Sequence, residues 1–452
     1  MGFSRFVFPI LSVTMLAAAP QLSETYQNVA TRIINAALAD RAGYAQLSYL
    51  CDRIGNRLSG SESLNQAIQW AVAQMKRDGL ENVTTEPVKV PYWVRGREDA
   101  EIVAPVRHQL SMLGLGGSVA TPKRGITAEV VPVSTFDGLE ALGRAKIAGK
   151  IVLFNVPYEG YGKTVVYRSI GASRAARLGA VAMLLRSVGS LAMQTPHTGA
   201  LAYSEHDPKI PAAAITLEDA TLIQRLTDAG SPVTVNLYME AHTLRDADSA
   251  NVMGEIRGRE KPEEIVVMGG HIDSWDVGAG AEDDGVGIMA SLEAAAIIHS
   301  LGLHPRRTLR VVFWTNEENG GAGGRAYRAA VDAQIHNYVA AIEMDEGAEK
   351  PLGFGVSPGG AVLDRIREIA RLLAPIGADT IRGGGGGADI DPLMQAGVPG
   401  LGLYTVGQHY FDWHHTRTDT VDKINPQNFR QCIAAMAVMG YVLADMPERL
   451  AR

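Results

Sequence analysis

The C-terminal half of the chain alternates between apolar, strand-like segments and helix-like segments. Four short apolar runs are typical of buried strands: EEIVVMGG (263–270), RTLRVVFWT (307–315), YVAAIEM (338–344) and VPGLGLYTV (398–406). The stretches that follow 285, 322 and 361 have apolar residues at helical spacing, as in VLDRIREIARLLAPIG (362–377). This alternation predicts an α/β fold with a mixed, largely parallel sheet between layers of helices.

Histidines and acids follow every one of these strands. In strand order they are His271, Asp273 and Asp283; Glu317 and Glu318; Asp345; and His414 with His415. Ligands of open α/β sheets bind beyond the carboxyl ends of the strands, so we expect these side chains to meet at one edge. Each acid alone is typical of a solvated loop or a helix N-cap, and only their joint occurrence predicts a site.

Imidazole and carboxylate donors together favour zinc, or cobalt or manganese, over calcium and magnesium. Three carboxylates (Asp283, Glu318 and Asp345) and a bridging hydroxide balance two divalent ions beside neutral histidines. A single zinc with five protein ligands would have no open position for a substrate. The sequence therefore predicts a pair of metal ions.

Spacing also suggests separate tasks for several acids. Asp283 stands just before a helix, where glycines give freedom and the helix dipole favours a carboxylate, so we expect it to bridge the ions. Asp273 is expected to accept the second ring N–H of a ligating histidine. Glu317 and Glu318 are adjacent and would point apart in a strand, so we expect one to bind metal and the other to act as a free base.

The N-terminal half predicts a different organisation. Residues 26–80 have helical periodicity and 82–94 alternate like a strand. Short strands such as GKIVLFNV (149–156) and a small-residue helix then predict a compact α+β module over 123–240. Its His197 and His206 stand alone, which favours packing or surface positions. Cys51 and Cys432 are interpreted as buried thiols rather than a disulfide.

The first residues resemble an export signal. One cation, an apolar stretch and small residues up to Ala19 are typical of a secretory signal peptide over 1–19. The apolar run is too short to span a membrane, so we expect export to a periplasm or the exterior without a stable membrane anchor. The net charge of −7 gives no reason to expect a nucleic acid as partner.

Several motifs resemble those of the co-catalytic zinc exopeptidases of the glutamate carboxypeptidase and bacterial aminopeptidase superfamily. They occur in that family's order: GGHIDSWDVGAGAEDDG, WTNEENGG, EMDEG, GADI with QAGVPG, and HHTRTDT. The resemblance implies that 20–122 and 241–452 form one catalytic domain and that 123–240 is an inserted protease-associated domain. Such a domain would shape access to the site and help the protein to oligomerise, for example as a homodimer.

The same resemblance implies roles for individual residues. His271 and Asp345 would hold one zinc, Glu318 and His415 the other, and Asp283 would bridge them. Glu317 would be the general base. His415 rather than His414 is implied as the ligand because the family's histidine directly precedes Thr or Ser.

The expected reaction is hydrolysis of short peptides, above all dipeptides with a free N-terminus. Asp389, Glu346 and His414 are candidates for the substrate pocket, the two acids for binding the amino group. The alternatives are an aminopeptidase of broader specificity, a glutaminyl cyclase-like transferase with one zinc, and a non-catalytic receptor-like protein.

Overall fold

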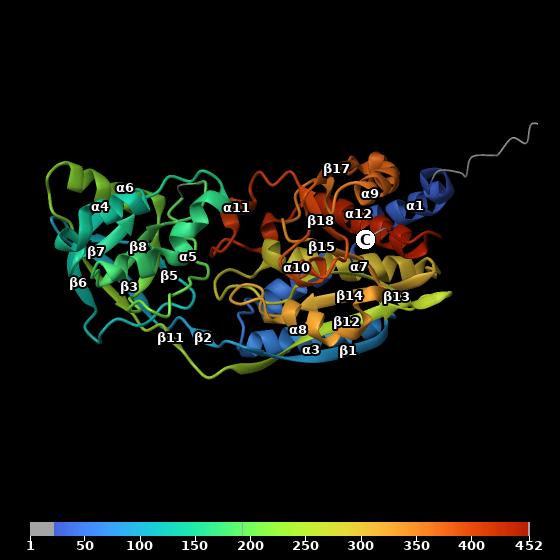
Figure 1. Ribbon diagram of the computed structural model, residues 1–452, viewed down its shortest axis with the longest axis horizontal. Helices are drawn as coiled ribbons and strands as arrows, with labels where there is room; N and C mark the ends of the chain where they lie inside the picture. Colours follow the sequence, from blue (N-terminus) through green and yellow to red (C-terminus); the bar gives the residue numbers. More distant parts are fainter. Residues whose placement is uncertain (1–21, 192, 451–452) are drawn as a thin grey trace, which may run out of the picture.

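The computed structural model describes residues 22–191 and 193–450, which form two lobes (Figure 1). The predicted signal peptide lies outside these residues. The larger lobe combines the N-terminal helices with the whole C-terminal half, and the smaller lobe is built from the middle of the chain. In the described part of the chain, no helix is long and apolar enough to cross a membrane.

An eight-stranded mixed sheet organises the larger lobe. Its strands in spatial order are β1 (Glu81–Val90), β12 (Ala247–Ile256), β14 (Arg307–Trp314), β13 (Lys261–His271), β15 (Tyr338–Glu343), β18 (Gly400–Thr405), β16 (Pro351–Ser357) and β17 (Thr380–Gly383). The four central strands, β14, β13, β15 and β18, are parallel to one another. Their carboxyl ends therefore meet at a single edge of the sheet.

Helices cover both faces of this sheet, as buried parallel strands require. One face carries α1 (Leu22–Ala39), α2 (Ala42–Tyr49), α3 (Glu62–Arg77), α7 (Val286–Ser300), α9 (Ala361–Ala370) and α12 (Pro426–Asp445). The other face carries α8 (Ala322–Ala330) and α10 (Asp391–Gln395). The predicted α/β class, with a mixed sheet between helices, is confirmed.

The smaller lobe has its own eight-stranded sheet. In spatial order its strands are β4 (His108–Gln109), β3 (Glu98–Ala104), β10 (Thr234–Met239), β6 (Ile126–Val133), β7 (Ile151–Phe154), β8 (Ala182–Arg186), β9 (Ala212–Ile215) and β5 (Met112–Gly114). Helices α4 (Phe136–Ile147) and α5 (Tyr161–Arg177) pack on one face and α6 (Leu217–Asp228) on the other.

The predicted start of this module at residue 123 is too late. Strands β3, β4 and β5 precede that residue and yet pair with strands of the smaller lobe. Their sequence between 98 and 114 mixes charged and apolar residues and gives little sign of which sheet it joins.

The two lobes are joined by more than their connecting strands. The chain crosses between them twice, through β2 (Trp93–Val94) and β11 (His242–Thr243), which pair with each other. In addition, Leu58 and Trp275 of the larger lobe pack into the apolar core of the smaller one. Cys51 and Cys432 are free and buried, as predicted.

Candidate metal centre

The predicted site residues converge at the carboxyl edge of the central strands. His271 is the last residue of β13, and Asp345 follows β15 by two residues. His271 Nε2 lies 3.1 Å from Asp283 Oδ1 and 3.5 Å from Asp345 Oδ1. We call His271 and Asp345 the His271 end of the site.

A second group lies on the other side of Asp283. His415 Nε2 is 3.2 Å from Asp283 Oδ2 and 3.0 Å from Glu318 Oε2. His414 Nε2 is 3.5 Å from the same Asp283 oxygen, and the two imidazole rings stack with centroids 3.6 Å apart. We call Glu318 and His415 the His415 end of the site.

Asp283 is therefore common to two groups of ligating atoms: His271, Asp283 and Asp345 form one, and Asp283, His414 and His415 form the other. It lies in η2 (Ala281–Gly285), directly before α7, as the glycine-flanked sequence predicted. Asp283 Oδ2 and Asp345 Oδ1 are buried, and despite these short distances neither accepts a well-aligned hydrogen bond from any residue that the structure describes. Carboxylate oxygens of this kind, next to imidazole nitrogens, fit a divalent cation such as zinc.

The electrostatics of the site point the same way. Burial opposes a charge on Asp283, but its contacts with His271 and His415 hold the pKa of this carboxyl well below its usual value. Burial would lower the pKa of the two histidines, yet the surrounding carboxylates raise the pKa of His271 and of His415 well above the ordinary value. Positive charge is thus favoured at both ends, and a metal ion would displace these protons.

Glu317 and Glu318 follow β14 in a turn rather than continuing the strand, since Asn316 has a φ of 66°. They still point apart. Glu318 contacts His415, whereas Glu317 Oε2 lies 4.0 Å from His271 Nε2. Burial and the neighbouring Asp283 raise the pKa of Glu318 to about 7.

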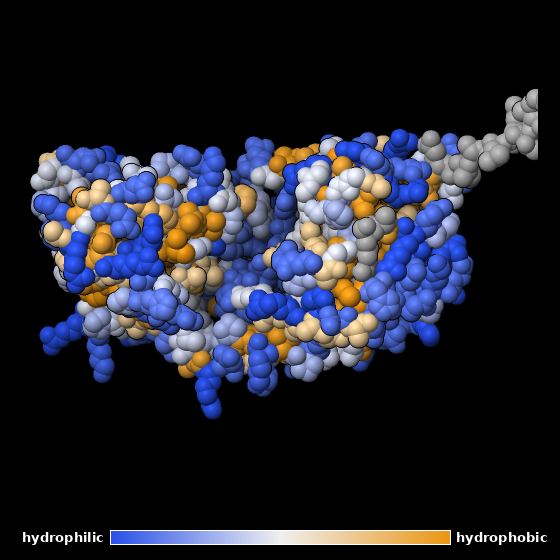
Figure 2. All heavy atoms as spheres, in the orientation of Figure 1, coloured by the Kyte–Doolittle hydropathy of each residue, from blue (hydrophilic) through white to orange (hydrophobic). Residues whose placement is uncertain are grey.

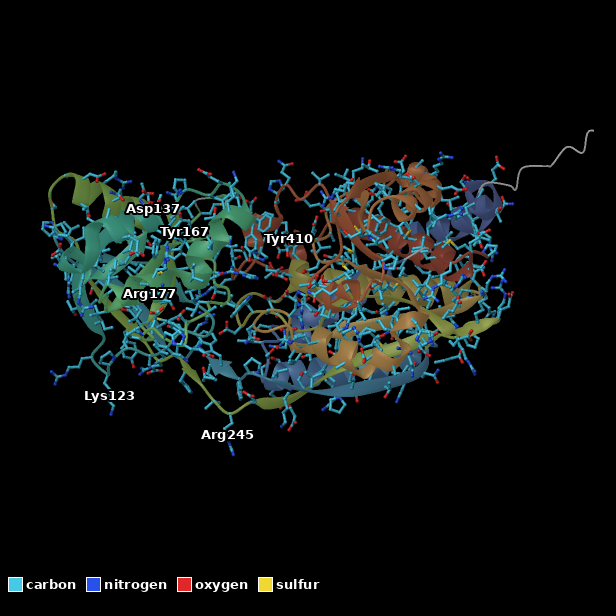
Figure 3. The ribbon with its side chains drawn as sticks, viewed as in Figure 1. Lys123, Asp137, Tyr167, Arg177, Arg245 and Tyr410 are labelled. Atoms are coloured by element: carbon cyan, nitrogen blue, oxygen red, sulfur yellow. The ribbon has the colours of Figure 1, made fainter. Side chains whose placement is uncertain are left out.

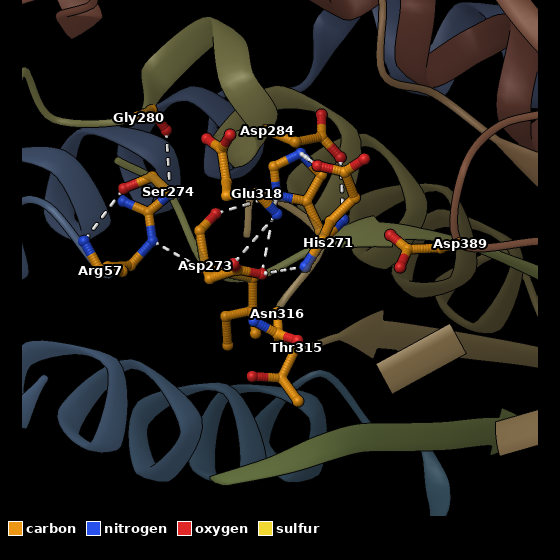
Figure 4. A network of polar contacts seen from close by, with 12 residues as sticks. Arg57, His271, Asp273, Ser274, Gly280, Asp284, Thr315, Asn316, Glu318 and Asp389 are labelled. Atoms are coloured by element: carbon orange, nitrogen blue, oxygen red, sulfur yellow. Dashed lines mark hydrogen bonds and ion pairs between the residues drawn. The ribbon is translucent and has the colours of Figure 1, made fainter. Parts of the chain in front are cut away.

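Asp273 supports the site differently from the prediction. Its carboxylate, which is fully buried, accepts the backbone N–H groups of Glu317 (3.0 Å) and Glu318 (3.4 Å). The ring Nδ1 of His271 donates instead to the backbone carbonyl of Asp273, at 2.9 Å (Figure 4). The Asp273 carboxylate faces the turn after β14 and orients the two glutamates. The Asp273 backbone carbonyl orients His271.

Sequence reasoning missed Arg57, which holds the loop between Asp273 and Asp283. Its buried guanidinium donates to the carbonyls of Ile272 (2.7 Å) and Gly280 (3.0 Å), as Figure 4 shows in part. Arg57 follows a helical segment more than two hundred residues before the loop. The only sequence signal was the RLSGS stretch (57–61) around it.

Known proteins with the same sequence pattern and fold identify the family. Residues 251–439 match Peptidase family M28. Carboxypeptidase Q of Mus musculus is 43% identical over 430 residues, covering 94% of this chain and 91% of that protein. The Homo sapiens protein of the same name is 43% identical, covering 94% and 90%.

A solved structure agrees over nearly the whole length. The peptidase M28 precursor from Shewanella amazonensis SB2B is 35% identical, with a TM-score of 0.91, covering 95% of this chain and 99% of that one. The chain belongs to peptidase family M28. It is a metallo-exopeptidase.

In this M28 peptidase the site opens into a cavity between the lobes. The cavity holds about 550 Å³ and is lined by Asp283, Glu317, Glu318, Asp345, His414 and His415 from the larger lobe and by Tyr161 and Arg168 from the smaller lobe. Figure 2 shows the hollow between the lobes with hydrophilic residues inside it. Tyr410 also lines the cavity, and Figure 3 shows it between the lobes.

The three predicted pocket residues differ in position. Glu346 lines the cavity, half-exposed, with an ion pair of 3.5 Å to Arg382. His414 lines it beside His415. Asp389 is only 1% exposed and is not among the residues that line the cavity. Within the described part of the chain, neither of its carboxylate oxygens has a hydrogen-bond partner. Its burial raises the pKa of Asp389 well above its usual value.

The smaller lobe of the M28 peptidase touches the site directly, which the sequence did not predict. Arg168 Nη1, on α5, lies 3.3 Å from His415 Nδ1, and the Tyr161 ring meets the edge of the His414 ring at 5.0 Å between centroids. His197 contacts the His414 carbonyl. His197 is thus a buried residue at the lobe interface, whereas His206 is exposed.

Proposed function

We propose that this M28 peptidase is a two-zinc exopeptidase that hydrolyses short peptides, above all dipeptides with a free N-terminus. The observation that carries the proposal is the pair of ligand groups that share Asp283 at the wall of a 550 Å³ cavity. A cavity of this size suits a small ligand.

In the proposal, His271 and Asp345 would hold one ion, Glu318 and His415 would hold the other, and Asp283 would contribute to both. Cobalt or manganese could occupy the same donors. When bound, such ions polarise the carbonyl of the scissile bond and make an attacking water more acidic.

Glu317 is the proposed general base. It lines the cavity, and unlike Glu318 it makes no contact with His415. It would take a proton from the attacking water and deliver it to the nitrogen of the leaving amine. Asp273 would hold the Glu317 main chain in place through the 3.0 Å hydrogen bond.

Glu346 is the better candidate for the amino group of the substrate, since it is the acid on the cavity wall that contacts none of the proposed ligands by an ion pair. For a dipeptide, removal of the C-terminal residue and removal of the N-terminal residue are the same cleavage. A dipeptide substrate therefore agrees with relatives called carboxypeptidases and with a recognised amino group.

The proposal also covers the smaller lobe, export and the oligomeric state. The smaller lobe would be a protease-associated domain that shapes access to the cavity, because it supplies Tyr161 and Arg168 to the wall. The protein would be exported by means of residues 1–19 and would act as a homodimer in a periplasm or outside the cell.

The test compares rates of hydrolysis for dipeptides, for longer peptides with the same first two residues, and for N-acetylated dipeptides. We expect dipeptides to be cleaved fastest and acetylated ones to resist. Equal rates on the longer peptides would replace the dipeptidase by the broader aminopeptidase. Rapid cleavage of acetylated dipeptides would refute the proposed role of a free amino group.

A further inference from the structure

The two ends of the metal centre receive their support from different lobes. At the His271 end, the hydrogen bonds of His271 go to Asp273, Asp283 and Asp284, all in the larger lobe. At the His415 end, the histidine pair also has partners in the smaller lobe. Besides Arg168, they belong to residues 196–199 (PHTG), here called the 196–199 loop.

The 196–199 loop pairs with the main chain of both histidines. The backbone N–H of Thr198 donates to the His415 carbonyl at 2.9 Å. His197 Nδ1 lies 2.8 Å from the His414 carbonyl, and because a carbonyl only accepts, this nitrogen carries the proton. Two hydrogen bonds from adjacent residues thus fix the backbone that presents both imidazoles.

The loop also contacts the ring of His415. The Thr198 carbonyl lies 3.3 Å from His415 Nδ1, on the opposite side of the ring from the Nε2 that faces Asp283 and Glu318. Arg168 Nη1 lies 3.3 Å from the same Nδ1, so two groups of the smaller lobe hold this edge of the ring and Nε2 is left facing the metal centre. The smaller lobe therefore orients the His415 ring, as the Asp273 carbonyl orients that of His271.

His415 needs this support because its backbone is strained. Its φ is 61°, in the left-handed region that a residue with a side chain seldom adopts. Such a conformation is energetically unfavourable and persists only where surrounding contacts hold it.

The 196–199 loop is itself rigidly held. His197 is 2% exposed and Thr198 is fully buried. The His197 N–H donates to Ser187 Oγ at 2.9 Å, and Thr198 Oγ1 donates to the Gly114 carbonyl at 2.8 Å. Arg168 Nη1 donates to the Thr198 carbonyl at 3.4 Å. The loop transmits the position of the smaller lobe to the histidine pair.

From these contacts we infer that the 196–199 loop positions His415 for metal binding, with His197 as its positioning residue, so that the smaller lobe is a structural part of one end of the metal centre. The inference rests on the proposed two-metal site. It predicts an asymmetry: disturbing the loop weakens the binding of one metal ion and spares the other.

The experiment titrates metal-free, full-length protein with Zn²⁺, and in parallel with Co²⁺ followed by its visible spectrum. His197→Leu removes the hydrogen-bond donor to the His414 carbonyl and fills the same space with an apolar side chain of similar size. His197→Asn is the matched control, since its side-chain amide offers an N–H at the branch point where the imidazole has Nδ1.

We expect wild type to bind two equivalents. In His197→Leu one equivalent should bind about 10–100-fold more weakly, as for other losses of support behind a ligand, and the other should change less than about threefold. His197→Asn should restore most of the lost affinity. If His197→Leu does not fold, Arg168→Met carries the test instead, since it removes the contacts with the Thr198 carbonyl and with His415 Nδ1. One of the two equivalents should again bind more weakly than the other.

Two results would overturn the inference. One is wild-type affinity for both equivalents in His197→Leu, or in Arg168→Met where that variant is used. The other is an equal loss at both equivalents that His197→Asn does not restore. A wild-type protein that binds fewer than two equivalents would instead refute the proposed two-metal function, and the inference with it.

Discussion

The His271 end and the His415 end of the metal centre have the same kinds of donor but different construction. The His271 end is a local product of the sheet: His271 closes β13, Asp345 follows β15, and the ring of His271 is held by Asp273 two residues away. The His415 end depends on contacts across the lobes, where Thr198 and His197 hold a backbone more than two hundred residues distant.

If the 196–199 loop positions His415 as proposed, the smaller lobe supports metal ligands that it does not itself supply. Trp275 makes the connection tighter. Its ring packs on Gly116 of the smaller lobe and meets the His415 ring at 5.6 Å, and its backbone N–H donates to Glu318. The His415 end should therefore respond to changes in either lobe, and the His271 end only to changes in the larger one.

The largest expected effect separates catalysis from metal binding. Glu317→Gln should lower kcat by about 10²–10⁴-fold, because it removes the proposed base, and should leave the zinc content near that of wild type. Glu318→Gln is the matched change one residue on and should reduce the zinc bound. Steady-state kinetics and elemental analysis measure both. Full activity in Glu317→Gln would refute the mechanism.

A smaller effect is expected from the residue that orients the two glutamates. Asp273→Ala removes the acceptor of the Glu317 and Glu318 N–H groups but keeps the carbonyl that holds His271. Turnover should fall about 10–100-fold, as for other losses of orienting contacts. Metal titration should show weaker binding at the His415 end, which contains Glu318.

Asp273→Asn keeps one acceptor oxygen and should lie between wild type and Asp273→Ala. If Asp273→Ala instead weakened the binding of only the ion held by His271, the carboxylate would be acting on the histidine, as the sequence suggested. Its contact with the turn after β14 would then be incidental.

The sequence predicted what the sheet alone determines. Buried parallel strands have continuous apolar runs, and the residues after them must meet at one edge, so His271, Asp283, Glu318 and Asp345 could be grouped without a structure. The α/β class and the free cysteines were predicted correctly for the same reason: they follow from local pattern.

Features that depend on distant contacts could not be predicted. Strand β16 has little signal in its own sequence, because the glycines in PLGFGVS (351–357) interrupt the apolar pattern and the strand depends on pairing with β17 and β18. His197 was interpreted as an isolated histidine, since nothing in the local sequence shows that its partner is the His414 carbonyl. The sequence also did not show that His271 Nδ1 donates to the Asp273 carbonyl rather than to its carboxylate, because the carboxylate is occupied by the turn after β14.

The attachment of the smaller lobe to the His415 end can be tested at Gly116. A Cβ there would lie 2.0 Å from Trp275 Cη2, so Gly116→Ala must displace the indole or the strand end. Overpacking of this kind costs about 1–3 kcal/mol of unfolding free energy. Chemical denaturation of the metal-loaded protein measures the loss.

Gly162→Ala is the control in the same lobe. Gly162 is in α5, a Cβ there meets nothing within 4 Å, and alanine is the better helix former. This variant should be as stable as wild type or slightly more stable. If Gly116→Ala matched it, the Trp275 contact would not hold the lobes together.

The smallest effect concerns a buried acid that belongs to neither end. Glu293 on α7 is 5% exposed, and burial, with Asp40 and Asp78 nearby, raises the pKa of its carboxyl from 4.5 to about 8. The folded protein therefore binds a proton that the unfolded chain has released, and the free energy of unfolding should fall by about 1 kcal/mol per pH unit between pH 6 and pH 8.

Glu293→Gln should remove that part of the dependence of the unfolding free energy on pH, measured by urea denaturation of the metal-free protein. The same change at exposed Glu263 is the control. An unchanged slope in Glu293→Gln would mean that Glu293 does not contribute and that the pH dependence comes from other buried acids and from the histidines.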